Sequence, residues 1–170
     1  MRNPQKSDGT VPETRRERGG LKNYTVTETS LINADAAQVY AVLADYHNGH
    51  PQILPKKYFS SLRVEEGGHG AGTKLRFTMH APGKTQDFHV AITELIPGRT
   101  LVETELDSGV VTTFTILPLD DGHSCRVTIS TELKAREGMV GVIEKSFTSM
   151  FLRRVYAQEL ELLSQVVTGS

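Results

Sequence analysis

Hydrophobic and polar residues alternate along most of the chain between residues 24 and 133, which is the period typical of strands. In one such stretch Leu75, Phe77 and Met79 alternate with charged and polar residues. The pattern predicts strands over residues 24–33, 58–65, 73–80, 86–96, 100–106, 110–117 and 125–133. Short turns rich in glycine, proline and aspartate separate the last six, so we expect antiparallel neighbours arranged as a meander.

Two parts of the chain follow a helical pattern instead. Residues 138–167 contain no proline, and no glycine after Gly141, which predicts one C-terminal helix of about eight turns. Asp35 is a suitable N-cap for a short helix whose apolar stripe includes Val39 and Leu43. Residues 47–55 carry two prolines and a glycine, so they are predicted to be irregular, with one further helical turn.

The apolar residues of the long helix divide between two faces. We expect one face to be fixed on the sheet: Leu152, Tyr156, Leu160, Leu163 and Val167. The opposite face would roof a cavity, cover a loop, or associate with a second copy in a homodimer: Val140, Ile143, Phe147, Met150 and Phe151.

The element order predicts an α+β fold in which a curved antiparallel sheet wraps around the C-terminal helix, with one or two short helices after the first strand. A single helix laid across a twisted sheet leaves a cavity where the sheet curls away. The length of 170 residues suits one domain, expected over residues 21–170. Residues 1–20 have Val11 as their single large aliphatic residue and are predicted to be a flexible tail.

Composition excludes several classes of function. The formal net charge of −1 argues against binding nucleic acid by phosphate neutralisation. The single cysteine, Cys125, excludes an internal disulfide and is predicted to be a buried, inert thiol. No apolar run is long enough to span a bilayer, and the N-terminus has no secretory apolar region, so we expect a cytoplasmic protein.

The chain resembles the START-like helix-grip (SRPBCC) superfamily, and within it the polyketide cyclase/dehydrase and lipid transport group. The resemblance covers residues 24–166 and rests on AAQVYAVLAD at residues 36–45 with Pro51 and Pro55 after it, on residues 72–75, on ITELIPGRTL at residues 92–101, and on residues 153–160. It implies an elongated hydrophobic cavity between the sheet and the C-terminal helix. Similar chains include aromatase/cyclases, lipid carriers, ligand receptors and co-chaperone-like domains.

Histidines are the first candidates for acid–base chemistry because imidazole titrates near neutrality. His69 and His123 lie in predicted turns, and the strand alternation points His80 and His89 away from the cavity. His47 and His50 lie in the irregular segment that the resemblance places near the cavity mouth, and His50 is the candidate for catalysis.

The strand of residues 100–106 carries two carboxylates, Glu103 and Glu105. The sequence pattern is compatible with both facing solvent and with both facing the cavity. Solvated strand carboxylates are the favoured interpretation, but a register change of one residue would turn both inward, where burial would raise their pKa. Glu103 is the second catalytic candidate.

No cofactor and no metal are expected. His47 and His50 have a spacing that would need Asp45 or another ligand folded close by. A G-x-S-x-G nucleophile motif is absent from the sequence. The glycine-rich run of residues 67–72 lacks the Lys-Ser/Thr ending of a phosphate loop, and it is predicted to be a flexible hairpin turn.

These observations predict a protein that binds a hydrophobic small molecule, a lipid or a polyketide-like aromatic. The expected lining residues are Leu75, Phe77, Met79, Phe88, Val90, Ile92, Phe114, Ile116, Phe147 and Phe151. Two alternatives stay open: a cyclase/dehydratase-type enzyme in which His50 or Glu103 moves a proton in the same cavity, and an interaction domain whose pocket is incidental.

Overall fold

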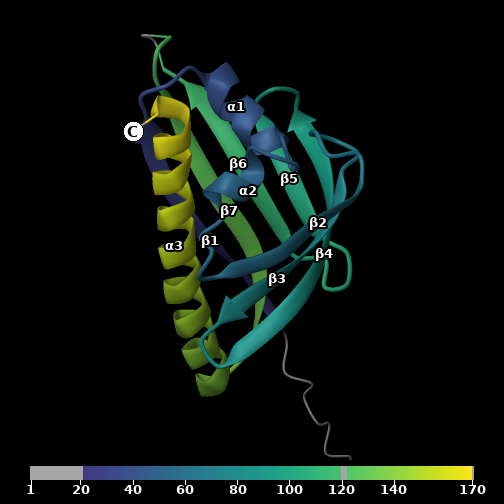
Figure 1. Cartoon of the computed structure of the whole chain (residues 1–170). Helices are drawn as coiled ribbons and strands as arrows, with labels where there is room; N and C mark the ends of the chain where they lie inside the picture. Colours follow the sequence, from purple (N-terminus) through teal and green to yellow (C-terminus); the bar gives the residue numbers. More distant parts are fainter. Residues whose placement is uncertain (1–20, 120–121, 170) are drawn as a thin grey trace, which may run out of the picture.

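The computed structural model describes residues 21–119 and 122–169, and shows a curved antiparallel sheet wrapped around one long helix (Figure 1). The elements follow one another as β1 (Leu21–Ile32), α1 (Ala36–Ala44), α2 (His50–Ile53), β2 (Phe59–Glu66), β3 (Lys74–Ala81), β4 (Lys84–Ile96), β5 (Thr100–Glu105), β6 (Val111–Pro118), β7 (Cys125–Arg136) and α3 (Met139–Thr168). The predicted α+β helix-grip fold is confirmed. The predicted tail, residues 1–20, lies outside the described residues.

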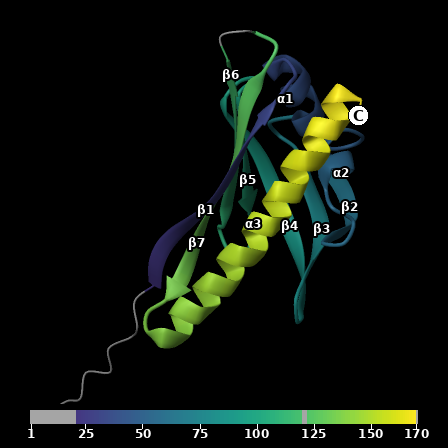
Figure 2. The same cartoon turned by 90° about the vertical axis from the view of Figure 1, so that its left-hand side faces the viewer.

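The seven strands lie in the order β1-β7-β6-β5-β4-β3-β2. Consecutive strands from β2 to β7 pair as the predicted meander. The first strand pairs with the last, from Leu21 opposite Arg136 to Ile32 opposite Cys125. The two short helices therefore connect opposite edges of the sheet, and they pass over one end of its concave face beside the C-terminal part of α3 (Figures 1 and 2).

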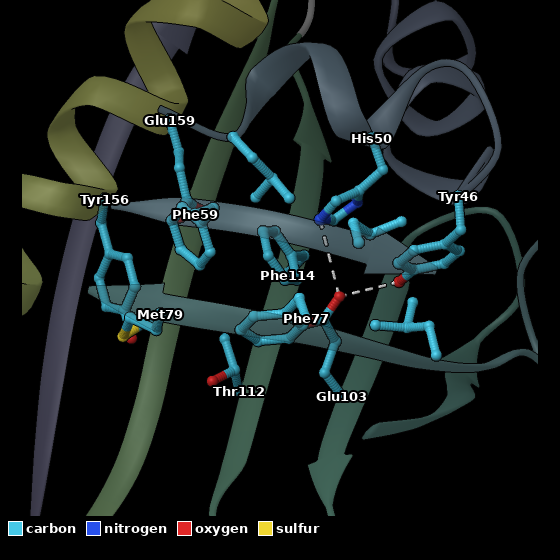
Figure 3. Close-up of a pocket in the computed structure, with 13 residues that line it drawn as sticks. Tyr46, His50, Phe59, Phe77, Met79, Glu103, Thr112, Phe114, Tyr156 and Glu159 are labelled. Carbon is cyan, nitrogen blue, oxygen red and sulfur yellow. Dashed lines mark hydrogen bonds and ion pairs between the residues drawn. The ribbon is translucent and has the colours of Figure 1, made fainter. Parts of the chain in front are cut away.

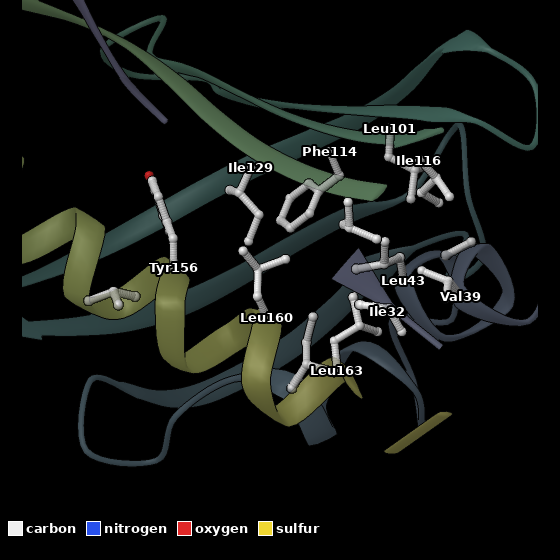
Figure 4. Packing of buried hydrophobic residues seen from close by; sticks show 14 of the residues in the cluster. Ile32, Val39, Leu43, Leu101, Phe114, Ile116, Ile129, Tyr156, Leu160 and Leu163 are labelled. Atoms are coloured by element: carbon white, nitrogen blue, oxygen red, sulfur yellow. The ribbon is translucent and has the colours of Figure 1, made fainter. Parts of the chain in front are cut away.

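Helix α3 is anchored on the sheet by the face that the sequence predicts. Leu152, Tyr156, Leu160 and Leu163 are buried, and Leu160 and Leu163 point into the apolar cluster between the sheet and α1 (Figure 4). The opposite face is exposed over the first half of the helix, where Phe147 and Met150 are each 64% exposed. None of the described helices is both long and apolar enough to cross a membrane.

Several predicted lining residues belong to the solid core or to the surface. Val90, Ile92 and Ile116 are almost fully buried among other apolar side chains. Phe151 is half-buried and meets the ring of Tyr58 edge-on, with centroids 5.3 Å apart. Phe147 lies at the surface because its position falls on the face of α3 that points away from the sheet, so the expectation that it roofs a cavity is wrong for this structure.

Leu160→Ala tests the anchor of α3. Leu160 is 3% exposed, so the substitution should lower the free energy of unfolding by about 2–5 kcal/mol. Phe147→Ala removes a larger side chain from the exposed part of the same helix, and it should change stability by less than about 0.5 kcal/mol. Urea unfolding of both variants measures the difference. Equal losses would contradict this assignment of the two faces.

Candidate functional site

A cavity of about 70 Å³ lies between the concave face of the sheet, α3 and the segment that contains α2 (Figure 3). Most of its wall is aromatic or aliphatic. The lining residues are Tyr46, His50, Leu54, Phe59, Leu62, Leu75, Phe77, Met79, Glu103, Thr112, Phe114, Tyr156 and Glu159. An apolar enclosure with a few convergent polar groups is the usual form of a small-molecule site.

Glu103 points into this cavity from β5. It pairs with Ile92 on β4, which is buried, and directly opposed residues share one face of a sheet. The favoured interpretation of Glu103 as a solvated carboxylate is therefore wrong: its side chain is 15% exposed. The alternation of apolar and polar residues along β5 does not show which face Glu103 occupies, because Thr100 and Leu101, which point to opposite faces, are both buried.

His50 faces Glu103 from the first residue of α2. Its Nε2 lies 3.8 Å from Oε1 of Glu103, and its Nδ1 lies 2.8 Å from the carbonyl oxygen of Leu43. Because a carbonyl can only accept, Nδ1 carries a proton and Nε2 is directed at the carboxyl group. The imidazole ring also stacks on Tyr46, with ring centroids 4.6 Å apart.

Tyr46 completes a polar cluster with these two residues. Its hydroxyl donates to Oε1 of Glu103 at 3.0 Å. Burial raises the pKa of Glu103, and the nearby His50 and the Tyr46 hydrogen bond only partly offset this. Burial, followed by the charge of Glu103, raises the pKa of Tyr46, so the phenol remains a donor at neutral pH.

A local turn holds Tyr46 and His50 side by side. The Asp45 carboxylate accepts the backbone N–H groups of His47 and Asn48, each at 3.0 Å, and the Asp45 carbonyl accepts the N–H of His50 at 2.7 Å. These backbone bonds, chiefly that from Asn48, lower the pKa of Asp45, because they stabilise the charged carboxylate more than the neutral carboxyl group.

The glycine-rich run clamps this turn from the other side. The carbonyl of Gly68 accepts the N–H of Tyr46 at 3.0 Å, and the N–H of Gly70 bonds the carbonyl of Ala44 at 2.9 Å. Gly68 has a φ of 122°, and a Cβ there would lie 2.1 Å from the His47 ring. The run predicted to be a flexible hairpin turn is therefore a backbone support for the site.

Glu159 enters the cavity from α3, and sequence reasoning missed it. The residue is 3% exposed, and no hydrogen bond acts on its carboxyl group within residues 21–119 and 122–169. Burial raises its pKa well above the ordinary value, and the charge of Glu103 adds to the shift. The signal was present in the sequence, since Glu159 lies three residues after Tyr156 and four before Leu163, on the predicted packing face.

Glu105 has a different role from Glu103, although it too is buried. Burial alone would raise its pKa, but hydrogen bonds from the backbone N–H and hydroxyl of Ser108, each at 2.6 Å, hold the pKa below the ordinary value. Glu105 thus closes the turn after β5 and takes no part in lining the cavity.

Four predicted ligand-binding residues line the cavity: Leu75, Phe77, Met79 and Phe114. Phe88 lies behind them, stacked on Phe77 with centroids 5.2 Å apart. The contact of any of these residues with a ligand stays a prediction. Sequence reasoning did not single out the cavity residues Tyr46, Leu54, Phe59, Leu62 and Thr112, nor the placement of Tyr156 in the cavity wall.

The other histidines lie outside the cavity. His47 and His69 are exposed, and His80 and His89 point outward as the alternation predicts, bonding Ser60 and Glu65 respectively. Within the described part of the chain, no three His, Cys, Asp or Glu residues lie close enough to hold a metal ion. Cys125 is buried, and burial raises the pKa of its thiol.

Residues 24–168 match the family model described as polyketide cyclase / dehydrase and lipid transport. The chain belongs to this family. A comparison with curated proteins finds no match.

Solved structures share the fold. The KanY protein has 30% sequence identity and a TM-score of 0.75, with 86% of this chain and 99% of that chain covered. A START superfamily protein from Mycobacterium smegmatis has 15% identity and a TM-score of 0.65, with 85% and 97% covered. The ZhuI aromatase/cyclase from Streptomyces sp. R1128 has 15% identity and a TM-score of 0.68, with 86% and 94% covered.

Glu159→Gln tests the energetic cost of the buried carboxyl. The folded-state pKa of Glu159 is raised, so the folded protein binds more protons than the unfolded chain, and this contribution to stability falls as the pH rises above about 4. Glutamine does not titrate. The variant should therefore gain stability relative to the wild type between pH 4 and pH 7, as measured by thermal unfolding.

Glu161→Gln is the matched control, because Glu161 is an exposed glutamate two residues further along α3. Its difference from the wild type should not change over this pH range. The same pH-independent difference for Glu159→Gln would contradict the burial of a titrating carboxyl at that position.

Proposed function

We propose that the protein binds a small, largely apolar molecule whose polar group is recognised by Tyr46, His50 and Glu103. The observation that carries the proposal is this hydrogen-bonded cluster at one end of an otherwise apolar cavity. Buried polar groups of this kind fix the orientation of a ligand, while the aromatic wall supplies most of the binding free energy. Membership of a family named for cyclases and lipid transport supports the same conclusion.

The size of the cavity sets a condition on binding. A cavity of about 70 Å³ is about half of an engineered cavity of about 150 Å³ that binds benzene. A ligand with an aromatic or lipid body must therefore displace side chains. Phe59, Phe77 and Met79 are only partly buried, so they are the lining residues that can move at the lowest cost.

Phe77→Ala tests the cavity. If space limits binding, removal of the ring should tighten the binding of an environment-sensitive naphthalene dye at least threefold. The substitution should also lower the free energy of unfolding by less than the roughly 3–5 kcal/mol that truncation of a fully buried phenylalanine costs. Fluorescence titration and urea unfolding provide the two measurements.

Thr78→Ala is the control, because Thr78 is the next residue on β3 and bonds Asp87 on the outer face. It should leave dye binding unchanged. A full core-type loss of stability for Phe77→Ala, with dye binding unaltered, would mean that this face is solid core and that the binding proposal is wrong. The interaction-domain alternative would then be favoured.

A second candidate is acid–base catalysis in the same cavity, and the His50–Glu103 geometry favours it. Nε2 of His50 has a free lone pair when the ring is neutral, and Glu103 has a raised pKa and can hold a proton. Together they can take a proton from a carbon next to a carbonyl group and give one to the carbonyl oxygen. That pair of transfers starts a ring closure or a dehydration.

The Kemp elimination of 5-nitrobenzisoxazole tests for a base in the cavity, because loss of one C–H proton opens its N–O bond to a coloured phenolate. His50→Gln should lower the rate about 100-fold or more, which is the range typical of general bases. His47→Gln, which alters the exposed histidine three residues earlier, should leave the rate unchanged. Equal rates for the wild type and His50→Gln would rule out His50 as the base.

A further inference from the structure

The cavity wall contains more acidic groups than basic ones. Two carboxyl groups enter it from different elements, Glu103 from β5 and Glu159 from α3, and the wall contains neither lysine nor arginine (Figure 3). His50 is the one lining residue that can carry a positive charge, and it already faces Glu103. An anionic ligand would therefore meet two acidic groups and a single imidazole.

Glu159 is the group that lacks a partner. It is 97% buried and lines the cavity, and within the described chain no hydrogen bond acts on its carboxyl group. No described side-chain polar atom that is sealed from solvent lacks a partner, so the Glu159 oxygens are open to the cavity. Buried polar side chains in folded proteins are almost always hydrogen-bonded, so a water or a ligand in the cavity accounts for this carboxyl group.

Glu103 also keeps one oxygen free. Its contacts with the Tyr46 hydroxyl and with His50 Nε2 both use Oε1, so Oε2 has no such contact among the described residues. Both carboxyl groups line the same cavity, and the charge of Glu103 adds to the raised pKa of Glu159. A ligand group with several N–H donors can bond both.

The rest of the wall suits a cation. Five lining residues carry benzene rings: Tyr46, Phe59, Phe77, Phe114 and Tyr156. The faces of such rings attract ammonium groups, most strongly where water is excluded. Carboxylates and ring faces together are the surroundings in which a buried ammonium group is stable.

We propose that the polar group of the ligand is a protonated amine, bonded by Glu159, attracted by the charge of Glu103 in the same cavity, and enclosed by the aromatic wall. This rests on the proposed binding function and narrows it to apolar or aromatic amines. When a neutral amine enters, a protonated carboxyl gives it the proton, and the pair becomes carboxylate and ammonium. When an ammonium ion enters, the carboxyl releases its proton to solvent. In both cases the Glu159 carboxylate gains the partner that it lacks.

Three probes of matched size test the proposal: benzylamine, benzyl alcohol and benzoate, each measured by displacement of the naphthalene dye from the full chain. Benzylamine should bind at least tenfold more tightly than benzyl alcohol at pH 7, and benzoate should be the weakest. Glu159→Gln should remove most of the preference for the amine, because it should weaken the binding of benzylamine more than that of benzyl alcohol. Glu103→Gln should also reduce the preference, and Glu161→Gln, on the exposed side of α3, should keep it.

The outcomes separate the two proposals. Binding of benzyl alcohol as tight as that of benzylamine, or tighter binding of benzoate, would overturn the amine assignment and leave the binding proposal intact. Failure of all three probes and of the dye would overturn both. Circular dichroism shows whether Glu159→Gln folds. If it does not, the order of affinities for the three probes, measured on the wild type and on Glu103→Gln, still tests the amine assignment.

Discussion

The packing of α3 across the concave face of the sheet is the contact on which the rest of the structure depends. Leu152, Tyr156, Leu160 and Leu163 follow one another at spacings of four, four and three residues, which keeps them on one side of the helix. Leu160 and Leu163 lie within the apolar cluster that includes α1, so the end of the sheet beneath α1 is filled (Figure 4). Glu159 lies on the same face of α3, so the contact that stabilises the fold also carries an acidic group into the cavity.

Backbone hydrogen bonds fix the residues at the polar end of the cavity. The turn at Asp45 fixes the relative positions of Tyr46 and His50, and the carbonyl of Leu43 orients the imidazole. Gly68 supports this turn through a backbone conformation that other residues rarely adopt. Because these bonds lie within the protein itself, the geometry of the cluster is preorganised, which is what recognition or proton transfer requires.

The sequence predicts the elements well and the site only partly. Period-2 alternation and the short turns identify the meander, and helical spacing identifies the anchored face of α3. The pairing of β1 with β7 is non-local and has no signal in either element. Glu103 was wrongly predicted to face solvent, because residues on both faces of β5 are buried and the strand therefore shows no clear alternation of apolar and polar positions. Glu159 was missed because its polarity removed it from a stripe defined by apolar residues, although its position lies within that stripe. His50 was selected for its chemistry and its place after α1. The structure places it in the cavity wall, and its catalytic role stays a prediction.

The two ends of the cavity differ in how freely they can change shape, and this difference bears on what the fold can do. The polar end is held by short backbone bonds, and His50 is 3% exposed. At the other end Phe59, Leu62, Phe77 and Met79 are only partly buried, and the Phe59, Phe77 and Phe88 rings pack on one another near the surface. Side chains with incomplete packing lose little when they move, whereas displacement of His50 or Tyr46 would leave buried polar groups unpaired. Under the proposed binding function, the apolar body of a ligand would therefore vary in size and shape while its polar group would meet a fixed arrangement of Tyr46, His50 and Glu103.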